Sequence, residues 1–426
     1  MVQKKTIGDM LAEYRRNSGL SFAQLENRTG LSRGVLQKIE SGETKRPEFK
    51  TVKSLAIIFP YPYEEIIEGY LEEETRSETL FEILQEVIQC DHTSLVERVS
   101  LKFLQSPNEK IEKALERLYN FSDSTAVIVI NNEIRLALYK VIANYARQCG
   151  EPIYIAKALF KKYLIERDDF TKLPQTYQSG EQILHYAEFL SPDERILLHY
   201  KLGVHAYNLG LFDDCIKLCK HVLKEDGTDS RIKADSTLAI CNSYYYSGDY
   251  GLSEKYLELF SHYSYPHVTE TVKVMEGAIN GKKGNLNLAI TQLQACLSEA
   301  TGNNIIHIVN ELFELYLKSN DVHSIENLLK YEGQMNNVNI RTPFKKTELA
   351  YYFRLKGDYK MRLGLIRDAV DSYLKATLEY AKVSAHEKGY ECVNQILNYY
   401  TKNKKEMDYF VINKIQKVYN ELIISR

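Results

Sequence analysis

The amino-acid sequence predicts an all-α protein with a small N-terminal domain and a long helical repeat array. Proline and glycine are scarce, at 9 and 21 of 426 residues, which favours long helices with short connections. Apolar residues recur with helical spacing along most of the chain. From about residue 200, a glycine or asparagine turn returns every 36 to 44 residues, which indicates stacked helical hairpins.

The composition excludes two broad classes of protein. Hydrophobic residues make up 44% of the chain and charged residues 26%, which excludes a globally disordered or membrane-embedded protein. No run of 18 apolar residues occurs, and the start of the chain lacks the pattern of a signal peptide. We therefore expect a cytoplasmic protein without a membrane partner. The seven cysteines are scattered without a C-x-x-C pair, so we expect neither disulfides nor structural zinc.

Charge is unevenly distributed along the chain. The first 60 residues carry eleven lysines and arginines against six acids, a balance of +5, whereas the whole chain has a net charge of −2. The remaining residues therefore carry −7. A small basic segment joined to a large acidic one suggests one module that binds a polyanion, attached to a body with a different task.

Residues 6–70 are expected to form five short helices around one apolar core, because apolar residues recur there at helical spacing. Gly30 can adopt the positive φ angle that turns the chain between two crossed helices, and Ser32 can cap the second of them. Leu36 and Ile39 then lie on the side of that second helix that packs against its partner.

The continuous stretch Leu20–Gly42 resembles the helix-turn-helix of the Xre, Cro and lambda-repressor family. The resemblance implies that residues 1–72 form a DNA-binding domain whose second crossed helix is the recognition helix. It also implies that Arg15, in the first helix, pairs with Glu40 at the end of the recognition helix.

Two positions depart from the family pattern. Phe22 stands where a glutamine usually contacts a phosphate, so that contact is expected to be missing. Glu26 stands where a small residue is usual, and it is expected to strain the close packing of the helices. The alternative to a DNA-binding domain is a helical packing domain whose basic face is only solvated.

The recognition helix would present the face opposite its buried side to the major groove of DNA. Arg33 suits the two acceptors of guanine and Gln37 the donor and acceptor of adenine, so these side chains are expected to read bases. Lys38, Lys45 and Arg46 are expected to hold phosphates. The complete set of predicted DNA-binding residues is Ser32, Arg33, Gly34, Gln37, Lys38, Lys45 and Arg46.

The body of the chain predicts helices joined by short turns. Five hairpins end their first helix at a turn residue: Gly210, Gly248, Gly284, Asn320 and Gly364. Their spacing resembles tetratricopeptide repeats, whose ideal period is about 34 residues. We therefore expect residues 73–426 to form a right-handed tetratricopeptide-type α-solenoid with a concave face. The segment Ala126–Ile130 has strand propensity, but we expect it to be a buried helix or a connector.

Residues at fixed positions of each first helix are expected to line the concave face. Asparagine amides can bridge the backbone of a bound peptide, and tyrosine offers apolar contact with a polar tip. The predicted peptide-binding residues are Tyr200, Tyr207, Asn208, Asp235, Asn242, Tyr245, Asn280, Asn310, Glu314 and Arg354. The same register adds Tyr246, Thr271, Val274, Lys282, His307, Tyr351 and Arg362. The alternative for each tyrosine is that it only packs adjacent helices.

The sequence does not favour an enzyme with its own active site. No Gly-rich phosphate loop, G-x-S-x-G or H-E-x-x-H motif occurs, so we expect neither catalytic residues nor a cofactor. Cys215, Cys219 and His221 are near one another in sequence. Both cysteines fall at repeat positions that face the hairpin core, so we interpret them as core residues and predict no metal site.

The pairing of an Xre-type helix-turn-helix with degenerate tetratricopeptide repeats resembles the RRNPP family of peptide-pheromone receptors, with NprR-like and PlcR-like members nearest in layout. The resemblance covers nearly the whole chain. It implies a quorum-sensing transcription regulator that binds double-stranded operator DNA as a homodimer. It also implies that a short imported signalling peptide binds the concave face and changes the affinity for DNA by shifting a conformational equilibrium.

Two other functions stay open. Rap-type members of the same family bind response regulators, so a response regulator is a candidate partner, and Gln85, Gln89 or Gln105 could act on it. Alternatively, the repeats could be a scaffold for other protein partners that the N-terminal domain tethers to DNA.

Overall fold

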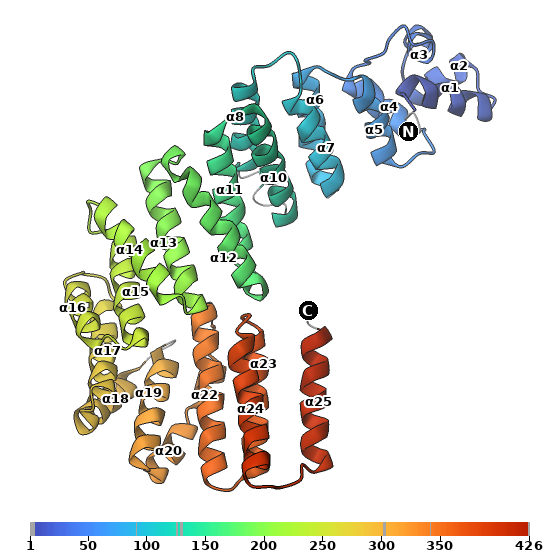
Figure 1. Cartoon of the computed structure of the whole chain (residues 1–426). Coiled ribbons are helices and arrows are strands. Elements are labelled where there is room, and N and C mark those ends of the chain that lie inside the picture. The colour runs from blue at the N-terminus through green and yellow to red at the C-terminus, as the bar shows by residue number, and fades with distance from the viewer. Residues whose placement is uncertain are drawn as a thin grey trace. The chain divides into compact units, whose positions relative to one another are not determined.

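A computed structural model of the chain describes residues 5–90, 92–124, 127, 131–300, 304–340 and 342–424 (Figure 1). These residues form helices and turns with no strand among them, which confirms the all-α fold class. Of the segment expected to be a buried helix or connector, only Val127 is among the described residues, and it is helical. Within the described ranges, no helix combines the length and the apolar character needed to cross a membrane.

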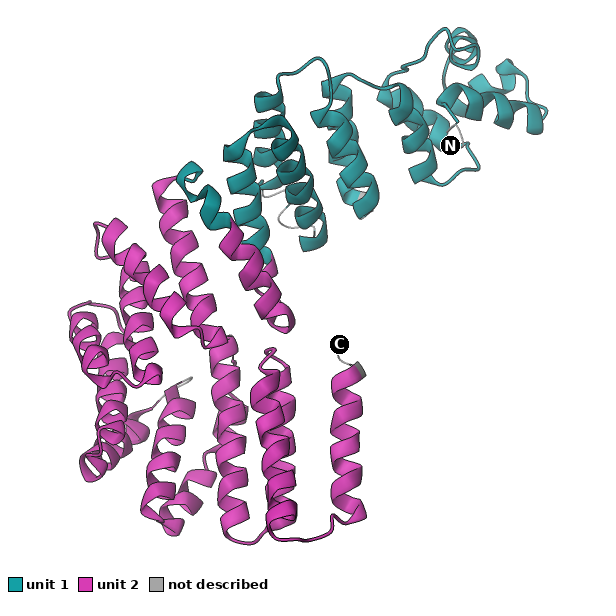
Figure 2. Cartoon of the chain, viewed as in Figure 1, with its two compact units in different colours: residues 1–165, 183–190 teal, residues 166–182, 191–426 magenta. Residues whose placement is uncertain are grey.

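The chain divides into two compact units (Figure 2). Unit 1 contains residues 1–165 and 183–190, and unit 2 contains residues 166–182 and 191–426. The domain boundary expected after residue 72 falls inside unit 1.

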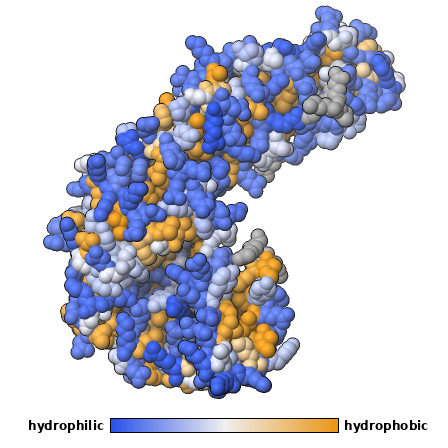
Figure 3. All heavy atoms as spheres, viewed as in Figure 1, coloured by the Kyte–Doolittle hydropathy of each residue, from blue (hydrophilic) through white to orange (hydrophobic). Residues whose placement is uncertain are grey.

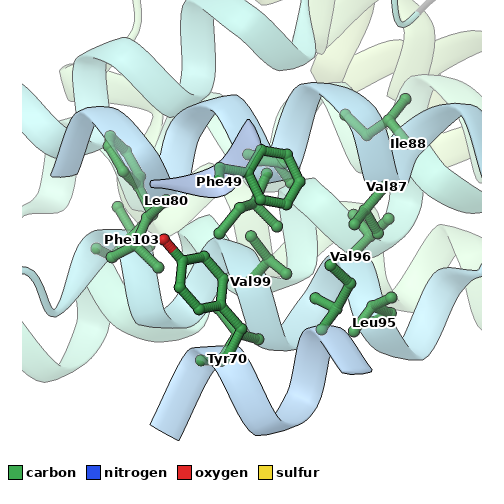
Figure 4. Close-up of a cluster of buried hydrophobic side chains, with 14 of the residues drawn as sticks. Phe49, Tyr70, Leu80, Val87, Ile88, Leu95, Val96, Val99 and Phe103 are labelled. Atoms are coloured by element: carbon green, nitrogen blue, oxygen red, sulfur yellow. The ribbon is translucent and has the colours of Figure 1, made fainter. Parts of the chain in front are cut away.

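Unit 1 begins with the five short helices expected from the sequence. They are α1 (Ile7–Asn17), α2 (Phe22–Thr29), α3 (Arg33–Glu40), α4 (Phe49–Ala56) and α5 (Tyr63–Glu73). Longer helices follow: α6 (Ser77–Val87), α7 (Thr93–Leu104), α8 (Ile111–Ser122), α10 (Asn132–Cys149) and α11 (Pro152–Glu166). One apolar core runs through all of these helices. Figure 4 shows Phe49 and Tyr70 of the short helices beside Phe103 and Val99 of α7.

An ion pair between the partly exposed side chain of Arg76 and the buried Glu74 reinforces the junction between α5 and α6. The carboxylate of Glu74 is fully buried and accepts hydrogen bonds from the Arg76 guanidinium and from Tyr70 Oη. Arg76 Nη2 also donates to the carbonyl oxygens of Arg46 and Pro47, at 3.3 and 3.2 Å. Burial alone would raise the pKa of Glu74, but these hydrogen bonds hold it below its ordinary value. The first five helices are therefore firmly joined to the next ones within unit 1.

Unit 2 consists of helical hairpins. It begins with α12 (Leu173–Glu181) after a short 3-10 helix, Phe170–Lys172. Five hairpins follow: α13 (Pro192–Leu209) with α14 (Phe212–Glu225), α15 (Arg231–Ser247) with α16 (Tyr250–Ser261), α17 (Val268–Lys282) with α18 (Leu286–Glu299), α19 (Asn304–Ser319) with α20 (Val322–Leu329), and α22 (Pro343–Arg362) with α23 (Ile366–Ala381). The remaining helices are α21 (Glu332–Asn336), α24 (His386–Lys402) and α25 (Tyr409–Ile424).

The predicted hairpin turns are confirmed by their backbone angles, and the paired helices approach one another closely. The five predicted turn residues all have positive φ angles: Gly210 77°, Gly248 85°, Gly284 93°, Asn320 57° and Gly364 75°. Asparagine is one of the few residues other than glycine that adopts this conformation readily. A Cβ atom on Gly203 would lie 2.6 Å from Cys219 Sγ, and one on Gly357 would lie 2.7 Å from the Tyr373 ring. Only glycine therefore allows these two hairpins to pack as they do.

In unit 2, segments that are far apart in sequence contact one another. The backbone N–H of Phe344, at the start of α22, donates to Asn208 Oδ1 near the end of α13, at 3.1 Å. The Phe344 ring lies 4.6 Å from the ring of Tyr207. Ser384, after α23, donates to the carbonyl oxygens of Phe170 and Thr171 at the start of the unit. The first and last hairpins are thus in direct contact.

A buried histidine should make the stability of unit 2 sensitive to acid. His205 is 1% exposed, lies against Tyr177, and burial lowers its pKa to about 4. His205 binds a proton more tightly in the unfolded chain than in the folded one. The free energy of unfolding of unit 2 should therefore fall by up to about 3 kcal/mol as pH falls from about 6.5 to about 4. Denaturant titrations of the wild type and His205→Gln across this range would check it. The substitution should flatten that part of the pH dependence, and an unchanged slope would contradict the assignment to His205.

Candidate functional site

Helix α3 has the geometry expected of a recognition helix. Gly30 ends α2 with a φ of 70°, and Ser32 caps α3 by accepting a hydrogen bond from the Val35 N–H. Leu36 and Ile39 are buried against the core. All seven predicted DNA-binding residues are exposed: Ser32, Arg33, Gly34, Gln37, Lys38, Lys45 and Arg46. Arg15 and Glu40 form the implied pair through two hydrogen bonds of 2.7 and 2.6 Å.

The two departures from the family pattern take structural roles. Phe22 packs under the Arg15 guanidinium, whose carbon lies 4.6 Å from the ring centre. Glu26 was expected to strain helix packing; its side chain is 34% exposed, between buried and fully exposed. Its carboxylate instead accepts a hydrogen bond from Arg33 Nε at 2.7 Å.

Gly34 occupies a position on α3 where the protein itself does not need glycine. A Cβ atom there would meet nothing within 4 Å, and its φ is not positive. Gly34→Ala should therefore stabilise unit 1 by about 0.5 kcal/mol, because glycine lowers helix stability. The same change should weaken DNA binding if the backbone at Gly34 approaches DNA closely. Melting curves would check the expected gain in stability, and a DNA titration would check the expected loss of affinity. Unchanged DNA affinity would contradict a place for Gly34 in the interface.

Two neighbouring cavities lie on the inner side of the hairpins in unit 2. The first, here the Arg354 cavity, has a volume of about 310 Å³. The second, the Asn242 cavity, has a volume of about 280 Å³. Both are lined by Tyr207, Tyr246, His307, Phe344 and Glu348. These shared residues come from α13, α15, α19 and α22, so the cavities lie where the two ends of the hairpin series meet.

The structure brings six of the ten predicted peptide-binding residues to these cavities. Tyr207, Asn208, Asn310, Glu314 and Arg354 line the Arg354 cavity. Asn242 lines the Asn242 cavity, together with Thr271 and Val274 from the same predicted register.

The other four predicted residues line neither cavity and have partners of their own. Tyr200 Oη donates to Asp235 Oδ2 at 3.4 Å, so these two residues bind one another. Tyr245 is buried against neighbouring aromatic rings. Asn280 Nδ2 donates to Gln292 Oε1 of its own hairpin at 2.9 Å.

A charged network crosses the wall of the Arg354 cavity between α17, α19 and α22. Lys282 Nζ lies 2.7 Å from Glu314 Oε2 and 3.6 Å from Glu311 Oε2. Tyr351 Oη donates to Glu314 Oε1 at 2.7 Å. Burial raises the pKa of Glu311 above its ordinary value, whereas the contacts with Lys282 and Tyr351 hold the pKa of Glu314 below it despite burial.

A second buried group joins α19 to the start of α22. His307 Nδ1 lies 2.6 Å from Glu348 Oε1, and Lys345 Nζ lies 2.7 Å from Glu348 Oε2. Burial would raise the pKa of Glu348, but Lys345 and His307 hold it at about 2. Burial would lower the pKa of His307, yet Glu348 keeps it above the ordinary value. The cavities therefore share the pair of Glu348 and His307 beside the aromatic rings of Tyr207, Tyr246 and Phe344.

Residues that line the Arg354 cavity carry buried side-chain atoms without a hydrogen-bond partner in the described part of the chain, among them Asn310 Oδ1 and His307 Nε2. Asn310 donates from Nδ2 to the Glu348 carbonyl at 2.9 Å, but its Oδ1 accepts no hydrogen bond. His307 uses Nδ1 for Glu348, and its Nε2 is likewise unpartnered. Buried polar groups of this kind are costly unless a ligand or water satisfies them. They make this cavity the candidate binding site of unit 2.

Several lining residues were not predicted from the sequence. They are Gly210, Phe212, Glu311, Phe344, Thr347, Glu348, Tyr380, Lys388 and Glu391 in the Arg354 cavity, and Leu238, His267, Met275, Asn304 and Lys345 in the Asn242 cavity. Lys388 adds positive charge beside Arg354, although burial lowers its pKa.

The cysteines expected in the core are there. Cys215 and Cys219 are fully buried, and their sulfur atoms are 4.0 Å apart. Among the described residues, no three His, Cys, Asp or Glu side chains are grouped so that they could hold a metal ion.

Comparison with known proteins supports the helix-turn-helix. Residues 6–59 match the family model described as a helix-turn-helix domain. The chain is 27% identical over 122 residues to the uncharacterized HTH-type transcriptional regulator RghRB of Bacillus subtilis (strain 168). The aligned segment covers 27% of this chain and 88% of that protein.

Three solved structures align with much of the chain at low similarity. A Rap protein complexed with competence and sporulation factor has a TM-score of 0.40 at 10% identity, covering 77% of this chain and 99% of that one. A signal-transduction ATPase with a tetratricopeptide repeat sensor from Pyrococcus horikoshii has a TM-score of 0.38 at 12% identity. The alignment covers 99% of this chain and 72% of that one. The protein phAimR has a TM-score of 0.38 at 12% identity, and the alignment covers 92% of this chain and 97% of that one.

Residues 6–59 are a helix-turn-helix domain of the kind that transcription regulators carry, and in joining it to a body of tetratricopeptide-like hairpins the chain resembles the RRNPP regulators.

Proposed function

We propose that this protein is a transcription regulator that binds operator DNA through α3 and is switched by a short imported signalling peptide. The observation that carries the peptide part is the Arg354 cavity, where Asn310 Oδ1 and His307 Nε2 are buried without partners. A peptide backbone supplies N–H and C=O groups that would satisfy both atoms.

Two adjacent cavities that share the ring of Phe344 can accommodate an extended peptide. Each has about the volume of a small ligand site, at 310 and 280 Å³, and both are bounded by Phe344. A linear chain could pass this ring and place one side chain in each cavity. Tyr207 and Tyr246 would contact apolar side chains, and Arg354 with Lys388 would attract a carboxylate.

Binding at this place can be coupled to the shape of unit 2. The cavity residues come from the first and last hairpins, so a ligand that contacts both favours the arrangement in which they are close. Such differential affinity is what a ligand needs to shift a conformational equilibrium. The sign of its effect on DNA affinity is set by which arrangement suits DNA.

The test is a footprint on the DNA that flanks the gene, with and without synthetic peptides from adjacent small reading frames. Salt is fixed near the physiological value, because a basic domain binds any DNA at low salt. A protected site whose occupancy changes with one peptide is expected. A protected site that no peptide alters would contradict the peptide switch. No protected site in either condition would contradict DNA regulation and favour a protein partner such as a response regulator.

We also propose that two copies associate through α25. This helix packs through its inner face, yet Ile412, Tyr419 and Ile423 on one flank are 49%, 62% and 54% exposed. Figure 3 shows hydrophobic atoms gathered over this helix. A two-fold axis would place the flank against its own copy, as needed by a protein whose helix-turn-helix domains read two half-sites.

Single charges on this flank should separate the copies. Ile412→Glu and Tyr419→Glu should each convert the dimer to a monomer at micromolar concentration, because a buried unpaired carboxylate opposes association. Asn413→Glu and Asn420→Glu add the same charge one residue further along the helix and should leave the dimer intact. Light scattering during size-exclusion chromatography would measure the mass. A monomeric wild type, or equal effects of both pairs, would refute this interface.

A further inference from the structure

The ion pair between Glu26 and Arg33 lies on the surface that would face DNA. Arg33 is the first residue of α3 and its side chain is 63% exposed, while Glu26 lies on α2. The hydrogen bond of 2.7 Å uses only the Nε donor of the guanidinium. A carboxylate at such a place repels phosphates and lowers the affinity for DNA in general. Its presence therefore needs a compensating role.

The geometry of the guanidinium supplies that role. Arginine has five N–H donors in a planar group, and Glu26 occupies the edge that carries Nε. The amino groups Nη1 and Nη2 remain as a fork of two donors, which matches the N7 and O6 acceptors of guanine. Holding one edge also fixes the direction of a long side chain before DNA arrives, so less conformational entropy is lost on binding.

We propose that Glu26 is a positioning residue for sequence readout. It directs Arg33 toward a guanine base and disfavours contact of the same guanidinium with a phosphate. The inference rests on the proposed reading of DNA by α3. It gives the unusual residue at position 26 a function in specificity rather than in packing.

The chain contains a matched control for this idea. Lys38 Nζ lies 3.0 Å from Glu43 Oε1 on the same surface, with side chains 56% and 64% exposed. This pair also sets an acid beside a cation of α3. An ammonium group is a compact point charge, so an acid beside it cannot select one edge as it does for arginine. Glu43 therefore tests the effect of charge alone.

The experiment begins with the full-length wild type and a pool of random DNA duplexes. Selection at fixed near-physiological salt yields the preferred site. The guanine read by Arg33 is then identified as the one whose replacement weakens binding of the wild type but not of Arg33→Ala. Dissociation constants are then measured for the preferred site and for the site with that base pair replaced. The proteins compared are the wild type, Glu26→Gln, Glu43→Gln and Arg33→Ala, after circular dichroism has confirmed equal folding.

The wild type should prefer the guanine site by between about fivefold and about 150-fold, the range of one good bidentate contact. Glu26→Gln should bring this ratio close to that of Arg33→Ala, mainly by strengthening binding to the replaced site. Glu43→Gln should strengthen binding to both sites alike and keep the ratio.

Two results would overturn the positioning role while leaving DNA reading intact. One is a Glu26→Gln protein that keeps the full ratio of the wild type. The other is a Glu26→Gln protein that behaves as Glu43→Gln does, which would mean that only its charge matters. If the wild type selects no preferred sequence, DNA reading by α3 fails, and the role of Glu26 fails with it.

Discussion

Glu348→Gln should cost unit 2 about 3 kcal/mol, the usual penalty for removing one partner of a buried ion pair. The carboxylate is 6% exposed and pairs with both His307 and Lys345, so glutamine would leave two cations without their counter-charge. Hydrogen exchange resolved over α19 and α22 would measure the change. A loss of this size predicts exchange about 100-fold faster at the most protected amides.

Glu391→Gln is the control for this substitution. Glu391 also lines the Arg354 cavity, but its side chain is 60% exposed and lies 3.7 Å from Arg354 Nη1. Its loss should change stability by less than about 0.5 kcal/mol, as is usual for exposed pairs. Equal exchange in the two variants would show that the buried pair does not stabilise the contact between α19 and α22.

The same group has a defined pH window. Because the pKa of Glu348 is held at about 2, its contribution is complete above about pH 4.5 and is lost as pH falls below that value. The pKa of His307 is raised, so its contribution is complete below about 6.5 and is lost as pH rises through the folded value. The pair therefore stabilises unit 2 most between about pH 4.5 and 6.5.

Asn242→Ala and Asn310→Ala should each reduce peptide affinity at least about tenfold, the cost of one well-formed hydrogen bond to a buried polar group. Each asparagine has an Oδ1 atom that is buried without a partner and lines a cavity. Calorimetry with the peptide identified by footprinting would give the affinities. DNA binding without peptide should stay as in the wild type.

Asn280→Ala provides the comparison. Asn280 belongs to the same predicted register, but its amide bonds to Gln292 and lines neither cavity. Peptide affinity should be unchanged in this variant. Equal losses in all three variants would mean that the peptide binds elsewhere on the concave side, and no loss in any of them would remove the cavities from peptide recognition.

The sequence predicted most of the fold because the fold depends on local rules. The turn between α2 and α3 needs a residue with positive φ, and Gly30 supplies it. The hairpins repeat the same requirement at Gly210 and at Asn320, so counting turn residues was enough to find them. The hydrogen bond between Glu26 and Arg33 was not predicted, because it depends on how α2 and α3 are placed relative to one another.

The cavities were only half predictable for a physical reason. Register along one helix identifies which side chains face inward, and this worked for Asn242 and Asn310. It cannot show which helices come together from distant parts of the chain. Phe344 and Glu348 line both cavities because α22 returns to α13, a contact that no repeat pattern encodes. Tyr200 lines neither cavity, and its hydroxyl donates to Asp235 on the next repeat.

The closure of unit 2 has a consequence for how the protein is made. In an open solenoid each repeat touches only its neighbours, so repeats can fold one after another as they leave the ribosome. Here Phe344 bonds to a residue 136 positions earlier, and Ser384 to one 214 positions earlier. Contacts this distant form late and slow folding. The early hairpins therefore gain these partners only after α22 and α23 have been synthesised, and in a nascent chain the surfaces that make these contacts stay exposed until then.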